Sequence, residues 1–418
     1  MLKIAEFMID SGMNADAVSL YDCAAAFCEK ARTGLSGKQD ELPMIPTYLK
    51  APGRMPQSGT AAVIDAGGTN LRLSSVSFKG GKPCIESLKQ LPMPGSEAPV
   101  AWEEFISTLA QELRPFADAA DAIGFCFSYP AEAGSDLDSR VLGLTKQVKI
   151  EGAEGRFPGR DLAAALRTLG CAEKKVVVLN DTPAVLLGGA AMHGTKDCDG
   201  YAGLIAGTGL NTCCVLDVSD IPKLPMGSGK MLVNLESGSF SGFARGSIDL
   251  AMDEDLPDTG YYVGEKMCSG RYLGMLCMYI MKAAAREGIF SDYASAVIER
   301  MAEVTTPTID KWGRGRFPKG FSAEDKVNLV YIINELFDRA ARCAAAELCG
   351  IMLLTGQGRE KPLNIAADGS LFNKSALFVP ELTKHMDIFA GEIMERRYRF
   401  VTGENLTLLG TAAAALMN

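Results

Sequence analysis

The sequence has few of the side chains that build a metal cluster. Its 418 residues include two histidines, His193 and His385, and no two of its twelve cysteines form a Cys-x-x-Cys pair. This spacing argues against a zinc cluster. The stretch from His193 to Cys198 is polar and is interpreted as a surface loop. Many unpaired cysteines in a long chain indicate a reducing compartment, so we expect a cytoplasmic protein.

Several common motifs are also missing. Gly229-Lys230 is followed by Met231, and Leu224 stands where a Walker loop needs its first glycine. No Gly-x-Gly-x-x-Gly opens a helix after a strand, which argues against a Rossmann cofactor. The apolar start of the chain is interrupted by Glu6 and Asp10, so it does not read as a secretory signal. No apolar run reaches membrane-spanning length, and we expect no membrane partner.

An excess of positive charge is absent as well. The net charge is −9 and the pI is about 5.1, which argues against a nucleic-acid partner. An anionic substrate then requires local basic groups or a metal ion. Hydrophobic residues make up 47% and charged residues 22%, as in an ordinary globular protein. A chain of this length can bury one large core or two lobes.

Two glycine-threonine turns are the most informative positive feature. Each interrupts an apolar stretch rich in β-branched residues, so each predicts a β-hairpin. Glycines let the backbone approach a ligand closely, and turn amides with a Thr hydroxyl can hold phosphate oxygens. Two such turns indicate a duplicated scaffold that holds a nucleotide from two sides. They comprise Gly67, Gly68, Thr69 and Asn70, and Gly207, Thr208 and Gly209.

Strands alternate with helices along the rest of the chain, which indicates an α/β protein. One amphipathic helix is expected over residues 14–32, with Asn14 as its cap and Gly34 after its end. Two longer helices are expected near 265–287 and 323–348, the second ended by Gly350. The tail is expected to be a strand over 406–410, a tight turn and a short helix over 411–417.

Asp181 is the first candidate for chemistry. It follows the strand at 175–179 and precedes a helix from Pro183, where open α/β sheets bind ligands. A carboxylate there can accept a proton from a substrate hydroxyl. The alternative is that Asp181 only caps the helix. Both roles are compatible.

Asp65 and Arg72 flank the first turn. Asp65 could hold Mg²⁺ through water, and Arg72 could neutralise charge on a transferring phosphoryl group. The plainer alternatives are a turn residue for Asp65 and a solvated strand residue for Arg72.

Four further polar residues could bind the hydroxyls of a sugar, since a carboxylate can accept from two vicinal hydroxyls. For Glu265 the alternative is a solvated helix face. The four are Thr145, Lys146, Glu236 and Glu265.

From about residue 42 to its end, the order of motifs resembles that of eukaryotic-type hexokinases and glucokinases, in the actin-like sugar kinase superfamily. Each motif alone is unspecific, but nine of them follow in the family's order. They are Leu42–Tyr48, Asp65–Arg72, Gly124–Pro130 with Leu144–Lys146, Val178–Thr182, Gly207–Asn211, Val233–Glu236, Gly264–Gly274, Arg339–Ala345 and Ala367–Ser370.

The resemblance implies two lobes, each with a ribonuclease-H-like core, hinged around an interlobe cleft. Residues 53–180 would form the small lobe, and residues 1–52 (the N-terminal helix and lead-in) with 181–405 the large lobe. The tail 406–418 would return to the small lobe.

The resemblance also implies an ATP-dependent hexokinase that phosphorylates the 6-hydroxyl of glucose or a related hexose, with Asp181 as general base and Mg²⁺ as cofactor. Its partners would be the hexose and ATP, and a homodimer stays open. The sugar would be held by Ser128, Thr145, Lys146, Asn180, Asn211, Glu236 and Glu265. The nucleotide would be held by both glycine turns, by Asp65, by Asp368, Gly369 and Ser370, and by Gly410.

Departures from the family pattern occur at three places. Ser237 stands where the family usually has Trp, Tyr129 replaces Phe, and Gly410-Thr411-Ala412 follows the final Gly-Ser-Gly only loosely. Three rival functions remain: a bacterial-type glucokinase or N-acetylhexosamine kinase, a sugar-binding regulator without catalysis, and an actin-like ATPase that needs no sugar. The first usually carries a cysteine-rich zinc segment, which this sequence lacks.

Overall fold

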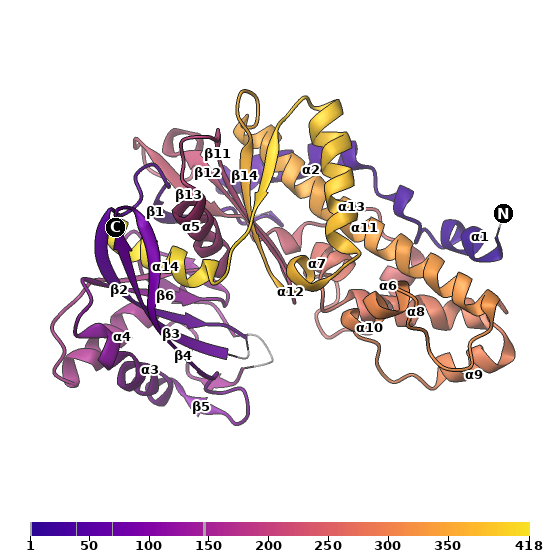
Figure 1. The fold of residues 1–418 in the computed structure, drawn as a ribbon, viewed down its shortest axis with the longest axis horizontal. Helices are drawn as coiled ribbons and strands as arrows, with labels where there is room; N and C mark the ends of the chain where they lie inside the picture. Colours follow the sequence, from indigo (N-terminus) through magenta and orange to yellow (C-terminus); the bar gives the residue numbers. More distant parts are fainter. Residues whose placement is uncertain (1, 39, 69, 145–147) are drawn as a thin grey trace.

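The structure is a computed structural model that describes residues 2–38, 40–68, 70–144 and 148–418. Its longer strands form two sheets that lie side by side, one in each half of the molecule (Figure 1). Helices cover the outer faces of the sheets, and two helices fill the space between them.

The first sheet has five strands in the order β10-β6-β2-β3-β4. The hairpin of β2 and β3 and the pairing of β3 with β4 are antiparallel, whereas β6 and β10 pair in parallel with their neighbours. This confirms the hairpin predicted at the first turn. The strands are β2 (Ser58–Ala66), β3 (Asn70–Lys79), β4 (Lys82–Pro92), β6 (Ala122–Phe127) and β10 (Val176–Leu179).

The second sheet has six strands in the order β1-β13-β12-β11-β14-β15. Strands β11, β12 and β13 form an antiparallel meander, and β14 and β15 continue the sheet in parallel. The second predicted hairpin is therefore also confirmed. The strands are β1 (Ile45–Lys50), β11 (Gly200–Ala206), β12 (Leu210–Asp217), β13 (Lys230–Asn234), β14 (Leu363–Asp368) and β15 (Tyr398–Val401).

The two sheets repeat one topology. Each contains a meander of three consecutive strands, and two later strands are added in parallel beside the first strand of that meander. β1 is an extra edge strand on the second sheet. The repeated order explains why both glycine turns join the first two strands of a meander, and it matches the duplicated fold that the two turns predicted.

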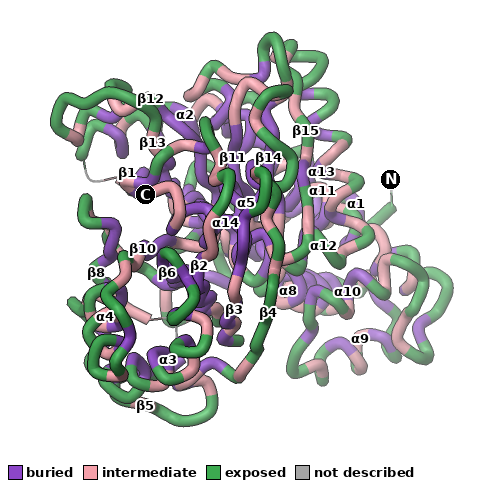
Figure 2. Tube along the Cα trace, turned by 60° about the vertical axis from the view of Figure 1, so that its left-hand side comes forward, coloured by how far each residue is buried: buried purple, intermediate pink, exposed green. Residues whose placement is uncertain are grey.

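Helices α5 (Asp181–His193) and α14 (Leu406–Met417) lie between the sheets. α5 packs on β11 and β14 of the second sheet, α14 packs on β2 and β6 of the first, and the two helices pack on each other. Both are apolar on every side because both are covered on every side, and both lie in the buried centre of the molecule (Figure 2). The chain thus crosses between the halves three times: between β1 and β2, at 180–181, and near 405.

The first sheet carries two helices on its other face, α3 (Trp102–Ala117) and α4 (Pro158–Thr168), whose apolar sides pack into one core with Phe125 and Phe127. Two short strand pairs extend this half: β5 (Val100–Ala101) with β9 (Ile150–Glu151), and β7 (Ala131–Ala133) with β8 (Ser139–Val141).

The second half contains most of the remaining helices around the long helix α11 (Ala323–Thr355), and they share one apolar core. A group at the lower right of Figure 1, below α1, consists of α6, α8, α9 and α10. The helices are α1 (Lys3–Asp10), α2 (Leu20–Leu35), α6 (Ser247–Glu254), α7 (Val263–Cys268), α8 (Leu273–Arg286), α9 (Asp292–Glu299), α10 (Thr306–Gly313), α12 (Ser370–Lys374), α13 (Phe378–His385), the π-helix η4 (Met386–Ile393), and the 3₁₀ turns η1 (Ala15–Ala17), η2 (Val218–Asp220) and η3 (Ser237–Ser239).

The helix predicted over 14–32 begins later than expected. A 3₁₀ turn, η1, precedes α2, and Asn14 makes no side-chain cap. The cap is Ser19, whose hydroxyl accepts a hydrogen bond from the amide of Asp22 at 3.3 Å. A serine followed three residues later by an acid is the stronger start signal, and the prediction passed over it.

The helix predicted over 265–287 is wrong as a single helix, because α7 ends at Cys268 and α8 begins at Leu273. In the gap, the amide of Gly270 donates to the carbonyl of Gly207 at 2.7 Å, and the amide of Arg271 donates to that of Thr208 at 3.1 Å. In a continuous helix the amides of Gly270 and Arg271 would donate to carbonyls of the helix itself. Here they donate to carbonyls of the second glycine turn instead.

The predicted ends of two other elements are also wrong. α11 continues through Gly350, which packs against Phe27 of α2, and it stops at Gly356, whose φ of 70° is the left-handed C-cap conformation. The tail is not a strand and a turn. Residues 406–417 form one continuous helix, α14, because its small residues pack directly on α5.

The described helices include none that is long and apolar enough to cross a bilayer. The first sheet lies within residues 53–180, and the second lies within 1–52 and 181–405. The lobe boundaries themselves stay a prediction.

Candidate active site

The first glycine turn lies beside a buried ion pair. Asp65 and Arg72 are opposite each other in the β2–β3 hairpin, and Asp65 is only 4% exposed. The guanidinium binds Asp65 Oδ2 through Nη2 and through Nε at 3.0 Å. It also donates to Asn405 Oδ1 at 3.3 Å and to Thr407 Oγ1 at 2.6 Å. In this conformation Arg72 thus supports Asp65 and ties the start of α14 to the first sheet.

The backbone of this turn is held from two sides. The amide of Gly67 donates to the carbonyl of Asn70 at 3.1 Å, and the hydroxyl of Tyr129 donates to the carbonyl of Gly67 at 2.7 Å. The Tyr129 phenol, which replaces the family's Phe, therefore adds a hydrogen bond to the predicted phosphate turn. Ser128 lies half-buried at the end of β6, where its amide donates to Ala66. Thr69 lies outside the described residues.

The second glycine turn is packed tightly by its neighbours. The amide of Gly207 donates to the carbonyl of Gly209 at 2.9 Å, and Gly270 and Arg271 bind the turn from the α7–α8 connection. Among the recorded hydrogen bonds of the described chain, none uses the amides of Thr208 and Gly209 as donors. These two amides are therefore free to hold an anion.

The predicted adenosine turn lies next to this second turn. A Cβ on Gly207 would lie 3.3 Å from the Cα of Gly369 and from the amide nitrogen of Ser370. Gly369 has φ 111°, which only glycine adopts readily, and a side chain there would overlap the carbonyl of Ala206. Asp368 Oδ1 accepts from the Gly369 amide at 2.7 Å and fixes the turn.

Glu265 faces the same turn from the other side. Its Oε2 accepts a hydrogen bond from the amide of Leu210 at 3.2 Å, and a Cβ on Gly209 would lie 2.5 Å from that oxygen. Burial raises the pKa of Glu265 to about 7, although the Leu210 amide and Arg271 act in the opposite direction. Glu265 is therefore not a solvated helix residue.

Asp181 is the first residue of α5, and Asn180 before it is the cap. Asn180 Oδ1 accepts from the amide of Thr182 at 3.1 Å, which leaves the Asp181 carboxylate available for another role. The interpretation of Asp181 as the cap is thus wrong. Burial raises the pKa of Asp181 to about 6, and the charges of Asp65 and Glu236 add to the shift.

Glu236 belongs to a chain of amides. Asn234 Nδ2 donates to Glu236 Oε1 at 2.7 Å, and Asn211 Nδ2 donates to Asn234 Oδ1 at 2.9 Å. Asn211 Oδ1 accepts in turn from the amides of Thr212 and Ser237. Glu236 has φ 55° and ψ 47°, a left-handed conformation that costs a residue other than glycine about 1–2 kcal/mol. The surrounding hydrogen bonds offset this strain, and burial raises the pKa of the carboxyl group.

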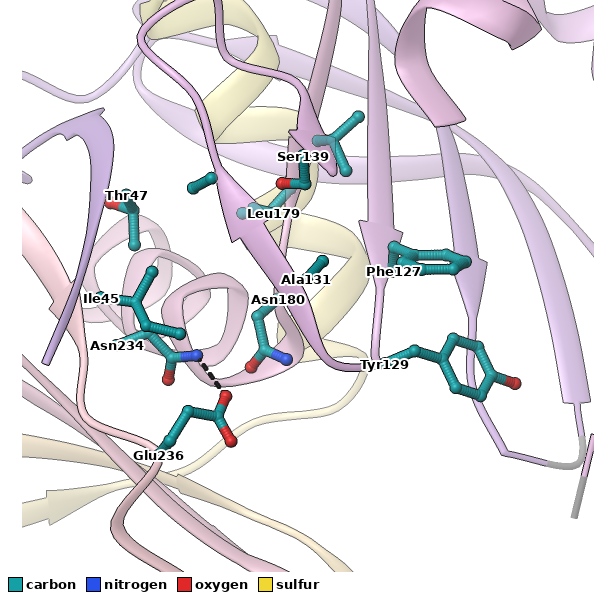
Figure 3. A pocket seen from close by; sticks show the side chains of 12 residues that line it. Ile45, Thr47, Phe127, Tyr129, Ala131, Ser139, Leu179, Asn180, Asn234 and Glu236 are labelled. Carbon is teal, nitrogen blue, oxygen red and sulfur yellow. Dashed lines mark hydrogen bonds between the residues drawn. The ribbon is translucent and has the colours of Figure 1, made fainter. Parts of the chain in front are cut away.

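A pocket opens between the two sheets at this point. Figure 3 shows the Glu236 carboxylate and the amides of Asn180 and Asn234 directed toward one another. The pocket connects the ends of β6 and β10 with β1 and β13. Its lining residues are Ile45, Thr47, Phe127, Tyr129, Ala131, Ala133, Ser139, Val178, Leu179, Asn180, Asn234 and Glu236.

The sequence-predicted residues are thus mostly brought together, with clear exceptions. Thr145 and Lys146 lie outside the described residues. Gly410 does not belong to a turn. It lies within α14, where a Cβ would overlap the carbonyl of Ala184 in α5, so its position is a helix contact.

Three residues of the site were missed as candidates. Asn234 lies in the Val233–Glu236 motif, in which only the glutamate was predicted to bind the sugar. Tyr129 was predicted only to differ from the family's Phe. Thr407 lies in the tail segment that was predicted to be a strand. The Asn-x-Glu spacing of 234 and 236 was the one usable signal, because a buried asparagine at a strand end needs polar partners.

Among the described residues, three carboxylates of the site, unlike Asp65, form no ion pair. In the described chain no salt bridge reaches Asp181, Glu236 or Glu265. Their raised pKa values show that the charged forms are poorly solvated. Carboxylates only accept hydrogen bonds, so this arrangement suits a neutral ligand with several hydroxyl donors.

The fold is shared with sugar kinases of known structure. It is similar to a hexokinase from Schistosoma mansoni in complex with glucose, with a TM-score of 0.81, 23% identity and coverage of 99% of both chains. It is less similar to a glucokinase of the ROK family from Streptomyces griseus in complex with glucose and AMPPNP, with a TM-score of 0.54, 18% identity and coverage of 86% of this chain and 100% of that one. The chain thus has the two-lobed, actin-like α/β fold of sugar kinases.

Sequence comparison gives the family. Two models described as hexokinase match residues 8–191 and residues 201–417. The chain is 28% identical over 423 residues to the hexokinase of Schwanniomyces occidentalis, covering 94% of this chain and 88% of that one. It is 30% identical over 380 residues to the hexokinase of Kluyveromyces lactis, covering 83% and 77%. This chain belongs to the hexokinase family, and it is a sugar kinase, a phosphotransferase.

Proposed function

We propose that this sugar kinase transfers a phosphoryl group from ATP to the 6-hydroxyl of glucose or a closely related hexose, with Asp181 as general base. One observation carries the proposal: the Asp181 carboxyl group lies at the start of α5, close enough to Asp65 and Glu236 for their charges to raise its pKa. Asp65 adjoins one phosphate turn, and Glu236 belongs to the hydroxyl-accepting cluster.

The hexose binds among the acceptors. Glu236 and Glu265 accept hydrogen bonds from its hydroxyls, and Asn180, Asn211 and Ser128 add amide and hydroxyl groups. Thr145 and Lys146 are proposed contacts from the resemblance alone. Hydroxyl donors from a sugar would satisfy carboxylates that have no cation, which explains why such poorly solvated groups are kept.

Asp181 then removes the proton of the reacting hydroxyl. A carboxylate with a pKa near 6 is ionised at neutral pH and is a stronger base than an ordinary aspartate. Its place at a helix N-terminus fixes its direction. Phosphoryl transfer depends mainly on positioning and electrostatics, so no histidine is required.

The phosphates lie between the two turns. The amides of Thr208 and Gly209, which donate no recorded hydrogen bond, would bind them from one side, and Gly67, Gly68 and Asn70 from the other. Thr69 is a proposed contact from the resemblance alone. The adenosine lies toward the turn of Asp368, Gly369 and Ser370, beside Gly207. Gly410 has no part in this proposal because it is a packing residue.

The donors near the first turn fit Mg²⁺. Asp65 offers carboxylate oxygens, and it lies close enough to Asp181 for its charge to raise the pKa of that carboxyl group, so two carboxylates of the kind that Mg²⁺ prefers lie near each other here. Asp65 would hold the ion through water, and the bound ion supplies positive charge to the terminal phosphate. Arg72 holds Asp65 in place through its hydrogen bonds, and its charge adds to the positive field at the phosphates.

Two alternatives remain with the same fold: a sugar-binding regulator with reduced catalysis, and an N-acetylhexosamine kinase. Retention of Asp181, Asp65 and both turns argues against the first. The TM-score of 0.81 with a hexokinase, against 0.54 with a glucokinase of the ROK type, argues against the second. The cytoplasmic location and the homodimer stay predictions.

An ADP-release assay tests the proposal. We expect release that depends on glucose, and on fructose, mannose or glucosamine to a smaller extent, with Mg²⁺ required. N-acetylglucosamine alone as acceptor would establish the second alternative. ADP release that is equal with and without hexose would establish an ATPase, and its complete absence with sugar binding retained would establish a regulator.

The pH profile gives a further prediction. Both Asp181 and Glu265 act as ionised carboxylates, and their pKa values are about 6 and about 7. Activity is therefore lost as pH falls. With saturating Mg-ATP, kcat/KM for glucose should fall below pH 7 and reach a slope of about one to two powers of ten per pH unit below pH 6.

Circular dichroism at each pH is the control for folding. The pH dependence of kcat, measured at saturating glucose, should follow the ionisation of Asp181. The rise in the glucose KM at low pH should follow the protonation of Glu265. A flat profile between pH 8 and pH 5 would contradict both assignments.

A further inference from the structure

A buried acid lies beneath the sugar-binding segments. Glu347, in the middle of α11, is 0% exposed, and no hydrogen bond is recorded for either carboxyl oxygen in the described chain. No salt bridge reaches it there either. A buried carboxyl group without a cation is held as the neutral acid, because the charge would lose its hydration without compensation.

The hydroxyl of Ser237 lies close enough to Glu347 to act on its carboxyl group. The pKa of Glu347 is raised well above its usual value by burial, with the Ser237 hydroxyl opposing the shift and Cys343 adding to it. Like the two Glu347 oxygens, the Ser237 hydroxyl is buried without a hydrogen-bond partner among the described residues, so each group could satisfy the other.

Ser237 is the residue after Glu236, and its backbone is part of the site. Its amide donates to Asn211 Oδ1 at 3.2 Å, and it begins the turn η3 that follows the left-handed Glu236. A side-chain anchor at Ser237 therefore holds the strained residue that presents a sugar carboxylate. Such a conformation persists only where its surroundings fix it.

The segment of the other proposed sugar carboxylate, Glu265, is connected to Glu347 through α7, which packs on α11. Cys268, at the end of α7, lies near Cys343 of α11, which together with burial raises the pKa of its thiol well above the usual value, with smaller effects from Glu347 and Glu265. α11 packs on α7 and on β12, so the acid lies under the segments of both Glu265 and Asn211.

The departure at position 237 is consistent with this arrangement. Where the family usually has Trp, a serine leaves room for the carboxyl group of Glu347. An indole ring at the same place would compete with that group for one buried space.

We propose that Glu347 is a positioning residue for the sugar site: its carboxyl group forms a hydrogen bond with the Ser237 hydroxyl when the site is in its working conformation, and this bond fixes the segments that carry Glu236 and Glu265. The proposal rests on the hexose kinase function given above. It requires a donor and acceptor at position 347 and does not require a charge.

The test uses three variants of the full chain. Glu347→Leu removes the polar group at similar size and should raise the glucose KM about tenfold with kcat within about twofold. Ser237→Ala should also raise the glucose KM. It is the smaller change, so it provides the test if the Glu347→Leu variant does not fold. Glu347→Gln keeps a donor and an acceptor and should hold KM within about twofold of the wild type. Glucose binding without ATP, measured by calorimetry, should follow the same order.

The matched control is Cys349→Ala, which changes a buried side chain of the same helix that faces Met386 instead of the sugar segments. It should lower thermal stability without changing the glucose KM. An unchanged KM in Glu347→Leu or Ser237→Ala, or a Gln variant as impaired as Leu, overturns the positioning role. A wild type without hexose-dependent ADP release overturns the proposed function itself, before any variant is compared.

Discussion

Asp181→Asn is expected to lower hexose-dependent turnover by about 10²- to 10⁴-fold, the usual contribution of a general base. The amide has nearly the shape of the carboxylate but cannot take a proton. Glucose binding should change little, because Glu236 and Glu265 supply the sugar acceptors. The measurement is steady-state ADP release with varied glucose, together with calorimetric glucose binding.

Asp292→Asn is the matched control. Asp292 is likewise the first residue of a helix, α9, behind a capping side chain, Ser291, but it is exposed and remote from the pocket. Its exchange should leave kcat and KM as in the wild type. Equal turnover in the Asp181 and Asp292 variants would remove Asp181 from the chemistry.

The same variant has a stability effect of known sign. The folded-state pKa of Asp181 is about 6, above the ordinary value of 3.8 for an aspartate, so the folded protein binds this proton more tightly than the unfolded chain. Ionised Asp181 therefore lowers the free energy of unfolding as pH rises from about 4 to 6, and by a constant amount above pH 6. Asp181→Asn should match or exceed the wild-type melting temperature at pH 8, with a smaller difference near pH 4. Loss of activity with retained stability separates catalysis from folding.

The sequence predicted the parts of the fold that depend on local signals. Both glycine turns stand between apolar stretches with β-branched residues, and this pattern alone requires hairpins at 66–70 and 206–210. The pairing of Asp65 with Arg72 then follows from the register, because the two positions are opposite each other across the turn.

The parts it missed depend on contacts between distant segments. The break between α7 and α8 has no local cause in the form of proline, and it exists because Gly270 and Arg271 bind the second turn. Similarly, Leu406–Gly410 reads equally well as a strand, and packing on α5 decides for a helix.

The candidate site shows the same division. Asp181 could be found from its place between a strand and a helix, whereas Asn234 and Thr407 acquire their roles only when Glu236 and Asp65 lie beside them. Glu347 gave no signal, since a glutamate in a helix normally faces solvent.

Gly410→Ala is expected to destabilise the fold by about 3 kcal/mol or more, the upper range for overpacking. A Cβ at this position would overlap the carbonyl of Ala184, and the same crossing brings Gly188 against the carbonyl of Leu406. α5 and α14 would have to separate, and they join the two sheets. The measurement is urea unfolding, with the ATP KM determined at low temperature on the folded fraction.

Gly391→Ala is the matched control, because Gly391 lies in the π-helix η4 and a Cβ there would meet nothing closer than 3.9 Å. It should be neutral or slightly stabilising, as alanine favours a helix by up to about 1 kcal/mol over glycine. The two interpretations of Gly410 predict opposite results. A nucleotide-binding turn would give a stable variant with a raised ATP KM, whereas a helix crossing gives an unstable variant whose folded fraction binds ATP normally. Thr407 of α14 also donates a hydrogen bond to Asp65 beside the first phosphate turn. An unstable Gly410→Ala variant that binds ATP normally would therefore show that the packing of α14 on α5 holds this turn in its position relative to α5.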